Sequence, residues 1–191
     1  RLGADATGKL VSIQQDFLNH TSVLDDYEED CSEATPFLYS VANLRVTGGL
    51  SRKNVGTPTA MRGPGAVPGL FALESAMDEL AVALKMDPIE LRRRNEPVKD
   101  ESNGKPFSSR HLQECIETGA AKFGWSSRTP DVGSMKRDGL TLGWGMSTCT
   151  WIAGRFPAEA TVLLQRDGTA VVETGHHDTG TGTHTVPAPA A

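Results

Sequence analysis

The chain has 191 residues, a formal net charge of −5, a hydrophobic content of 38% and a charged content of 23%. The negative charge argues against nucleic acid as a main partner, because binding to phosphates requires a basic surface. The hydrophobic content is sufficient for a buried core, yet no apolar run approaches the roughly 18–20 residues of a membrane span.

The first four residues carry no signal-peptide pattern and resemble the middle of a strand, so we expect either a piece of a longer chain or a processed start. The compartment stays open. Cys31, Cys115 and Cys149 share no short spacing, so no zinc or iron–sulfur motif is present. We expect reduced, buried thiols, and a single disulfide remains an alternative.

The N-terminal part predicts strands. Residues 1–4 and 10–17 read as two strands joined by a hairpin turn, and residues 44–46 read as a third, short strand. Six acidic residues lie between positions 25 and 33. We interpret them as a solvated loop or helix face, because the ligand ladder of a calcium loop is absent.

The middle of the chain predicts helices. From Gly69 to Leu84 apolar residues recur at steps of three and four, which is typical of a helix with a core-facing stripe. Asp87 and Pro88 form a helix start, and the arginines at 92–94 are expected at its solvated end. Ser108 is expected to cap a further helix that ends at Gly124. The predicted stripe consists of Leu70, Phe71, Leu73, Ala76, Met77, Leu80, Ala81 and Leu84.

The C-terminal part returns to strands. Residues 159–165 and 170–175 are predicted to pair across the turn at 166–169. The order of elements predicts an α+β fold with mixed sheets and two to three packed helices. We divide the chain into a first part (residues 1–125), a linker (126–138) and a second part (139–191).

The segment Asp178–Thr185 alternates glycine and threonine directly after a predicted strand. Gly180 and Gly182 let backbone N–H groups approach an oxyanion closely. Followed by a helix start, such a loop suits a phosphate or another cofactor group that accepts hydrogen bonds. An ordinary turn is the alternative. Hydroxyl donors are supplied by Thr179, Thr181 and Thr183.

The segment 57–65 is a rigid loop, interrupted by glycines, directly before the long predicted helix. It holds Arg62 near a helix N-terminus, where anions are favoured. An exposed loop arginine without a ligand is the alternative interpretation.

Other candidates are weaker. His176 and His177 are neighbours on a strand and point to opposite faces, so we expect no metal site there. Trp144, Trp151 and Phe156 are expected either to line a substrate pocket or to pack in a core or interface.

Several motifs together resemble one family. Four segments occur in the order found in the molybdopterin-binding subunit of the xanthine dehydrogenase/aldehyde oxidase family. They are Met61-Arg62-Gly63-Pro64-Gly65, the predicted helical segment 68–92, Phe123-Gly124-Trp125 and Asp178–Thr185. The version here is most similar to the bacterial aldehyde oxidoreductase branch. The resemblance identifies residues 1–125 as the first part of the molybdopterin-binding region and residues 139–191 as the start of a second subdomain.

The resemblance implies a molybdenum hydroxylase that oxidises aldehydes or N-heterocycles with water-derived oxygen. Electrons would pass to 2Fe-2S and FAD groups on partner subunits, and bacterial members usually carry the cytosine dinucleotide form of the cofactor. Arg62 would orient substrate or stabilise developing charge. The residues implied to bind the cofactor are Arg62, Gly63, Gly65, Thr179, Gly180, Thr181, Gly182 and Thr183.

The chain also departs from the family pattern. The Gly-Gly-x-Phe-Gly loop and the Gly-x-Gly-Glu segment with the general-base glutamate do not occur in it. We therefore expect a fragment that is inactive in isolation. The alternative is a non-catalytic phosphate- or nucleotide-binding module, or a degenerate homologue that serves as a scaffold.

Overall fold

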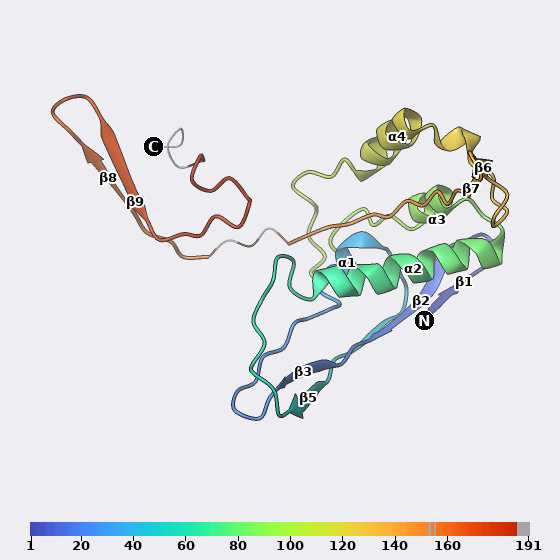
Figure 1. Ribbon diagram of the computed structural model, residues 1–191, viewed down its shortest axis with the longest axis horizontal. Helices are drawn as coiled ribbons and strands as arrows, with labels where there is room; N and C mark the ends of the chain where they lie inside the picture. The colour runs from blue at the N-terminus through green and yellow to red at the C-terminus, as the bar shows by residue number, and fades with distance from the viewer. Residues whose placement is uncertain (153, 155, 187–191) are drawn as a thin grey trace. The chain divides into compact units, whose positions relative to one another are not determined.

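The computed structural model describes residues 1–152, 154 and 156–186, and the chain divides into two compact units, residues 1–151 and residues 152–191. The first unit combines small sheets with helices, and the described part of the second contains a strand hairpin (Figure 1). The predicted α+β class, with mixed sheets and packed helices, is confirmed.

The sheet of the first unit begins with the predicted hairpin. β1 (Leu2–Ala4) and β2 (Leu10–Asp16) are antiparallel, and the Asp5 carboxylate accepts hydrogen bonds from the Thr7 and Lys9 amides in the turn between them. β4 (Leu44–Thr47) adds to β2 in parallel. Farther along the same two segments, β3 (Asn19–Ser22) and β5 (Leu50–Lys53) form a second parallel pair.

The long helix α2 (Ala66–Leu84) lies across this sheet (Figure 1). Its residues Leu73, Met77 and Ala81 are buried against the sheet and α3, as the apolar periodicity predicts. Phe71 is the exception, because it is 76% exposed and is not part of the core of this unit. The remaining buried members of the core are Leu10, Ile13, Leu38, Tyr39 and Leu91.

The short helices follow local capping rules to different degrees. α3 (Pro88–Arg94) begins as predicted, since the Asp87 carboxylate accepts from the Ile89 and Glu90 amides. α1 (Thr35–Leu38) is a single turn that carries proline in its first turn. Neither the Asp87 cap nor the proline needs a distant partner, so such starts are readable from sequence.

The start of α4 (Leu112–Phe123) was predicted wrongly. Ser108 does not cap it; His111 occupies the N-cap position and makes no side-chain cap hydrogen bond. The Arg110 side chain is held by Glu96 and by the carbonyl of Phe37, and this fixes the chain before the helix. The end of α4 is confirmed, because Gly124 has a φ of +82° in the left-handed region.

Arg92 also corrects a prediction. It was expected at a solvated helix end, but it is 2% exposed. Its guanidinium lies 2.9 Å from Glu74 and 2.9 Å from Asp78, both on α2. Arg93 and Arg94 remain at the surface, so only two of the three arginines follow the expectation.

Between α4 and residue 151 the chain forms only short elements. These are the 3-10 helix η1 (Trp125–Ser127) and the strand pair β6 (Lys136–Arg137) and β7 (Leu140–Thr141). The boundaries expected at 125, 126–138 and 139 stay a prediction. Within the described residues, no helix combines the length and the apolarity that crossing a membrane requires.

The cysteines differ from expectation in burial but not in state. All three are free thiols, yet Cys115 and Cys149 are exposed and only Cys31 is partly buried. Burial raises the pKa of the Cys31 thiol, and the neighbouring carboxylates of Glu29, Asp30 and Glu28 raise it further. The Cys31 thiol is therefore a poor nucleophile candidate.

The second unit contains the predicted hairpin. β8 (Ala160–Leu164) pairs with β9 (Ala170–Thr174) in antiparallel register, and Gly168 in the connecting turn has a φ of +86°. The chain then continues through residues 175–182 into one turn, in which the Val186 amide donates to the Gly182 carbonyl at 3.3 Å. The sequence predicts a helix start after this loop, and residues 187–191, where prolines disfavour its continuation, lie outside the described residues.

Candidate cofactor-binding site

The loop that carries Arg62 ends at the N-terminus of α2. Arg62 is exposed, and its guanidinium has no hydrogen bond or ion pair with any residue that the structure describes. Gly63 and Gly65 both have a positive φ, +70° and +67°, which bends the chain into the first turn of the helix. The guanidinium is therefore available to a ligand beside a helix N-terminus.

A carboxylate already occupies this helix end. The Gly65 amide donates a hydrogen bond to a carboxylate oxygen of Glu29 at 2.7 Å. This contact shows that the N-terminus of α2 accepts an anion in this position, as its dipole favours. Glu29 belongs to the acidic segment 25–33, which the sequence predicted to be a solvated loop.

Gly65 is required here by a close approach of two backbones. A Cβ added at Gly65 would lie 2.5 Å from the carbonyl oxygen of Asp30, and one added at Gly69 would lie 1.7 Å from that of Cys31. The loop and the first turns of α2 thus pack directly on residues 29–31. Closeness to a cofactor, the reason implied for Gly65 by resemblance, stays a prediction, and the packing on residues 29–31 already requires glycine.

The second candidate loop, residues 178–185, closes on its own aspartate. One carboxylate oxygen of Asp178 accepts from the Gly180 amide at 2.8 Å and the Gly182 amide at 3.3 Å. The other accepts from the His184 amide at 3.5 Å. The two glycines have φ values of +105° and +75°, which an L side chain rarely adopts. Three amides therefore converge on one anionic group.

The electrostatics of this loop agree with the geometry. The Gly180 amide, followed by those of His184 and Gly182, holds the pKa of the Asp178 carboxyl below its usual range. The nearby His184 ring lowers this pKa slightly further. The loop thus stabilises a negative charge at its centre, which is the property that a phosphate-binding loop needs.

The threonines have separate roles in the loop. The hydroxyls of Thr181 and Thr183 are 2.7 Å apart and hydrogen-bonded to each other. Thr181 and Thr179 are exposed, and Thr183 is partly buried. All three hydroxyls can therefore turn toward a ligand without unfolding the loop.

The two candidate loops belong to different units, residues 1–151 and 152–191. Each loop by itself has a geometry that suits an anion. Their meeting around one ligand stays a prediction.

Sequence reasoning missed a buried polar network in the first unit. The carboxylate of Glu74, which is 5% exposed, accepts from Arg92 Nε at 2.9 Å and from the Thr148 amide at 2.7 Å. The Tyr39 hydroxyl donates to the same carboxylate and lies 3.0 Å from the Thr148 hydroxyl. Burial, together with the charge of Glu74, raises the pKa of Tyr39 well above its usual range.

Two members of this network, Glu74 and Thr148, line a cleft between α2 and residues 145–149. The cleft has a volume of about 540 Å³ and is lined by Leu70, Phe71, Asp78, Met146 and Cys149, among others. The signal for it was present in the sequence. Glu74 lies four residues after Leu70 and three before Met77, so it falls on the buried face of the helix.

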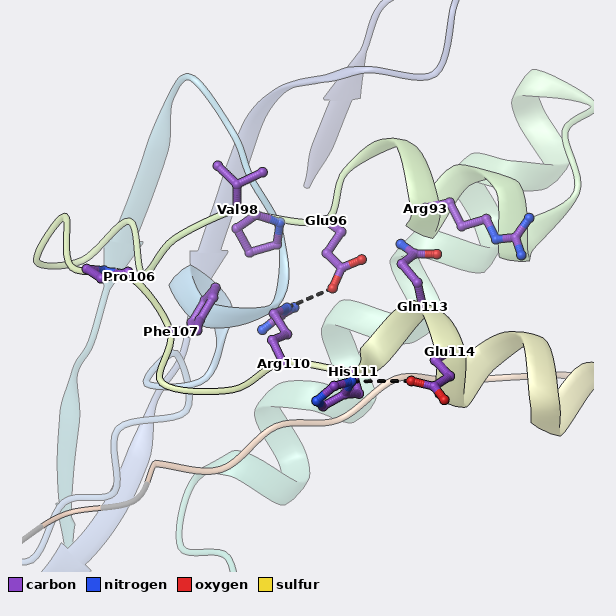
Figure 2. Close-up of a pocket in the computed structure, with 10 residues that line it drawn as sticks. Arg93, Glu96, Val98, Pro106, Phe107, Arg110, His111, Gln113 and Glu114 are labelled. Atoms are coloured by element: carbon purple, nitrogen blue, oxygen red, sulfur yellow. Dashed lines mark hydrogen bonds and ion pairs between the residues drawn. The ribbon is translucent and has the colours of Figure 1, made fainter.

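A second cavity of about 670 Å³ lies beside α4 (Figure 2). Two pairs form within its lining: Arg110 with Glu96 at 2.8 Å and His111 with Glu114 at 3.2 Å. The Arg110 guanidinium also stacks on the Phe107 ring, 4.6 Å from its centroid. The Arg110 Nη2 atom is buried and has no hydrogen-bond partner among the described residues, so the cavity keeps one free donor.

The remaining candidates have structural roles or none. Trp144 packs edge-on against Phe123 with ring centroids 4.9 Å apart, which is the packing alternative of the sequence analysis. Trp151 is 51% and Phe156 82% exposed. Among the described residues, no three or more His, Cys, Asp or Glu side chains gather as a metal-binding group.

Comparison with known proteins relates both candidate loops, the Arg62 loop and the Asp178 loop, to one kind of domain. Family models described as "Molybdopterin cofactor-binding domain" match residues 1–96 and residues 118–191. The first range includes the Arg62 loop, and the second includes the Asp178 loop.

Among curated proteins, the chain is 35% identical over 187 residues to the aldehyde oxidoreductase molybdenum-binding subunit PaoC of Escherichia coli (strain K12), covering 97% of the chain and 25% of that protein. It is 30% identical over 197 residues to the xanthine dehydrogenase molybdenum-binding subunit of Escherichia coli O157:H7, covering 97% and 26%. The chain therefore spans about a quarter of the length of these relatives.

Among solved structures, the chain is similar to the aldehyde oxidoreductase from Desulfovibrio desulfuricans. The TM-score is 0.55 and the sequence identity 29%, covering 64% of the chain and 14% of that structure. The aldehyde oxidoreductase from Desulfovibrio gigas gives a TM-score of 0.56 at 24% identity and covers 90% of the chain and 20% of that structure, which supports the fold.

Proposed function

The chain belongs to the molybdopterin cofactor-binding family of aldehyde oxidoreductase and xanthine dehydrogenase subunits, and on that premise we propose that it forms part of the catalytic subunit of a molybdenum hydroxylase. The substrates would be aldehydes or N-heterocycles. The enzyme would receive the cofactor in its cytosine dinucleotide form and pass electrons to 2Fe-2S and FAD groups on partner subunits.

The residues of this chain fit such a cofactor. The amides of Gly180, Gly182 and His184 surround a carboxylate, so the same loop offers the donors that a phosphate oxygen accepts. At the other segment, the exposed Arg62 lies three residues before the N-cap Gly65 of α2. A guanidinium beside a helix N-terminus suits an anionic or hydrogen-bond-accepting group.

Two carboxylates would have to yield to the ligand. Glu29 at the Gly65 amide and Asp178 at the glycine–threonine loop hold the positions that a phosphate or pterin oxygen would take. Both are at or near the surface, so their rotation into solvent has a low desolvation cost. The ligand would then accept hydrogen bonds from the freed amides, and Thr181 and Thr183 would add hydroxyl donors.

In this proposal the molybdenum group supplies the oxidising equivalents when it is bound, and this chain supplies positioning. Arg62 would hold the substrate oxygen or stabilise the charge that develops on it. Because Gly63 and Gly65 carry no side chain, they would let the backbone of the loop come close to the cofactor. The observation that carries the proposal is the match of both loops to one cofactor-binding family, each with anion-binding geometry.

A substitution of Arg62 tests the role of the first loop. In the full protein that contains this chain, Arg62→Ala is expected to lower aldehyde turnover by about 10²-fold or more, as loss of a transition-state donor does. The exposed loop position predicts an unchanged unfolding free energy. Arg45→Ala, at an exposed strand position of β4, is the matched control and should keep wild-type turnover. Unchanged turnover in Arg62→Ala would remove this residue from the active site.

The isolated 191-residue chain provides a second test. We expect it to have no molybdenum-dependent aldehyde oxidation, because the glutamate motif for the general base is not in its sequence. Activity of the isolated chain would contradict this part of the proposal. Family membership does not favour the alternative of a non-catalytic phosphate-binding module.

A further inference from the structure

Two histidines at the ends of the glycine–threonine loop lie side by side. His176 Nε2 and His184 Nδ1 are 3.2 Å apart, and the ring centroids are 5.0 Å apart. The sequence excluded a shared ion for His176 and His177, because adjacent strand residues point to opposite faces. The loop instead brings His176 together with a histidine eight positions later, which no local pattern shows.

The distance between the two nitrogens has a specific meaning for metal binding. Two imidazoles that bind one Zn²⁺ ion, each about 2.0–2.1 Å from the metal, lie roughly 3.3 Å apart at a tetrahedral angle. The observed 3.2 Å corresponds to nearly that angle. We propose that His176 and His184 form a binding site for a divalent transition-metal ion that prefers imidazole, with Zn²⁺ as its representative.

The loop fixes this spacing before any metal binds. Asp178 accepts from the amides of Gly180, Gly182 and His184, so its carboxylate closes the segment between the two histidines. Asp178 is therefore a positioning residue for the site and not a ligand. Both rings are exposed, so water reaches the remaining coordination positions. No third His, Cys, Asp or Glu side chain joins the pair among the described residues, so water would have to complete the coordination.

Metal binding requires one ring to change its tautomer. In the present pair, the facing nitrogen of one ring carries a hydrogen and donates it to the facing nitrogen of the other ring, so neither of these two lone pairs is free. When the ion binds, the donating ring becomes the other tautomer, and its hydrogen moves through solvent to its second nitrogen. Both facing nitrogens then coordinate, and the neutral pair keeps its total number of protons.

Calorimetric titration of the full chain with Zn²⁺ tests this site. We expect one ion per chain, and we expect His176→Ala and His184→Ala each to weaken binding by about tenfold or more. Asp178→Asn should weaken binding by a smaller factor, because it loosens the loop while both rings remain. His177→Ala is the matched control, since it removes an exposed neighbouring imidazole outside the pair.

Imidazole NMR in the same titration separates the site from unspecific binding. The ring signals of His176 and His184 are expected to shift together at one equivalent of Zn²⁺, and that of His177 should stay in place. Absence of Zn²⁺ binding would overturn the proposal, as would an equal loss of affinity in His177→Ala. These measurements need no molybdenum cofactor, so their outcome is independent of the function proposed above.

Discussion

Glu74 on α2 accepts a hydrogen bond from the backbone amide of Thr148 at 2.7 Å, across 74 positions of sequence. The same carboxylate pairs with Arg92 and accepts from Tyr39, so α2, α3 and the segment at 145–149 share one buried anion. Glu74 therefore holds residues 145–149 against the helix that begins at the Arg62 loop. The arrangement of the first unit depends on a charge that lies inside an apolar stripe.

Removal of this charge should be costly. Glu74→Ala leaves the Arg92 guanidinium buried without its main partner, and loss of one member of a buried pair costs about 3–5 kcal/mol of unfolding free energy. Denaturant unfolding of the full chain measures this loss. Glu117→Ala, which breaks the exposed pair with Arg93, is the control and should cost less than about 1 kcal/mol. Equal effects of the two substitutions would show that the network does not stabilise the fold.

Two helical glycines should respond to alanine in opposite directions. At Gly69 an added Cβ would lie 1.7 Å from the Cys31 carbonyl oxygen, so Gly69→Ala must displace backbone and should destabilise by more than about 2 kcal/mol. At Gly119 in α4 nothing lies within 4 Å. Gly119→Ala should therefore stabilise by about 0.5–1 kcal/mol. Thermal unfolding of both variants decides, and a stabilised Gly69→Ala would contradict the close packing of α2 on residues 29–31.

The raised pKa of Tyr39 predicts a loss of stability at alkaline pH. The unfolded chain releases the phenol proton above about pH 10, whereas the folded chain keeps it. The stabilising contribution is therefore complete below pH 10 and is lost as the pH rises, by about 1.4 kcal/mol per pH unit. Tyr39→Phe should show a shallower decline between pH 10 and 11. Identical pH profiles of the two proteins would exclude a buried, neutral Tyr39.

The lowered pKa of Asp178 predicts opening of the glycine–threonine loop in acid. Because the carboxylate is the favoured form in the folded loop, its contribution is present above the ordinary value of about 3.9 and is lost as the pH falls through the lower folded value. The Gly180 amide resonance should shift with a midpoint below about pH 3.9. In Asp178→Asn this titration should disappear. A midpoint at or above the ordinary value would contradict the observed ring of amides.

Much of this fold was predictable because its signals are local. Asp87 and Pro88 start α3, Gly124 ends α4, and the turn at 166–169 joins β8 to β9, each within a few residues of chain. The apolar periodicity of α2 also identified its buried face. Such features depend on capping residues, on glycines that adopt a positive φ and on the spacing of apolar side chains, and all three can be read from the sequence.

Two of the failures have a common cause in distant partners. Arg92 was expected in solvent because its ion pairs lie 14 and 18 positions earlier, on another helix. Ser108 was chosen as a cap because the ties of Arg110 to Glu96 and to the Phe37 carbonyl were invisible in the local pattern. The sequence predicted an anion site in the Asp178 loop, but it did not predict that the aspartate of the loop would itself provide the anion. Long-range pairing decides the first two cases, whereas the contacts of Asp178 span only two to six positions.

The central claim is that the Arg62 loop and the Asp178 loop hold one pterin-type cofactor. The most direct measurement is a crystal structure of the full, cofactor-loaded protein, with distances from the cofactor to both loops. We predict hydrogen bonds from the amides or hydroxyls of residues 179–183 and contact with residues 62–65 on the same cofactor molecule. A bound cofactor that touches only one of the two loops, or neither, would contradict the account.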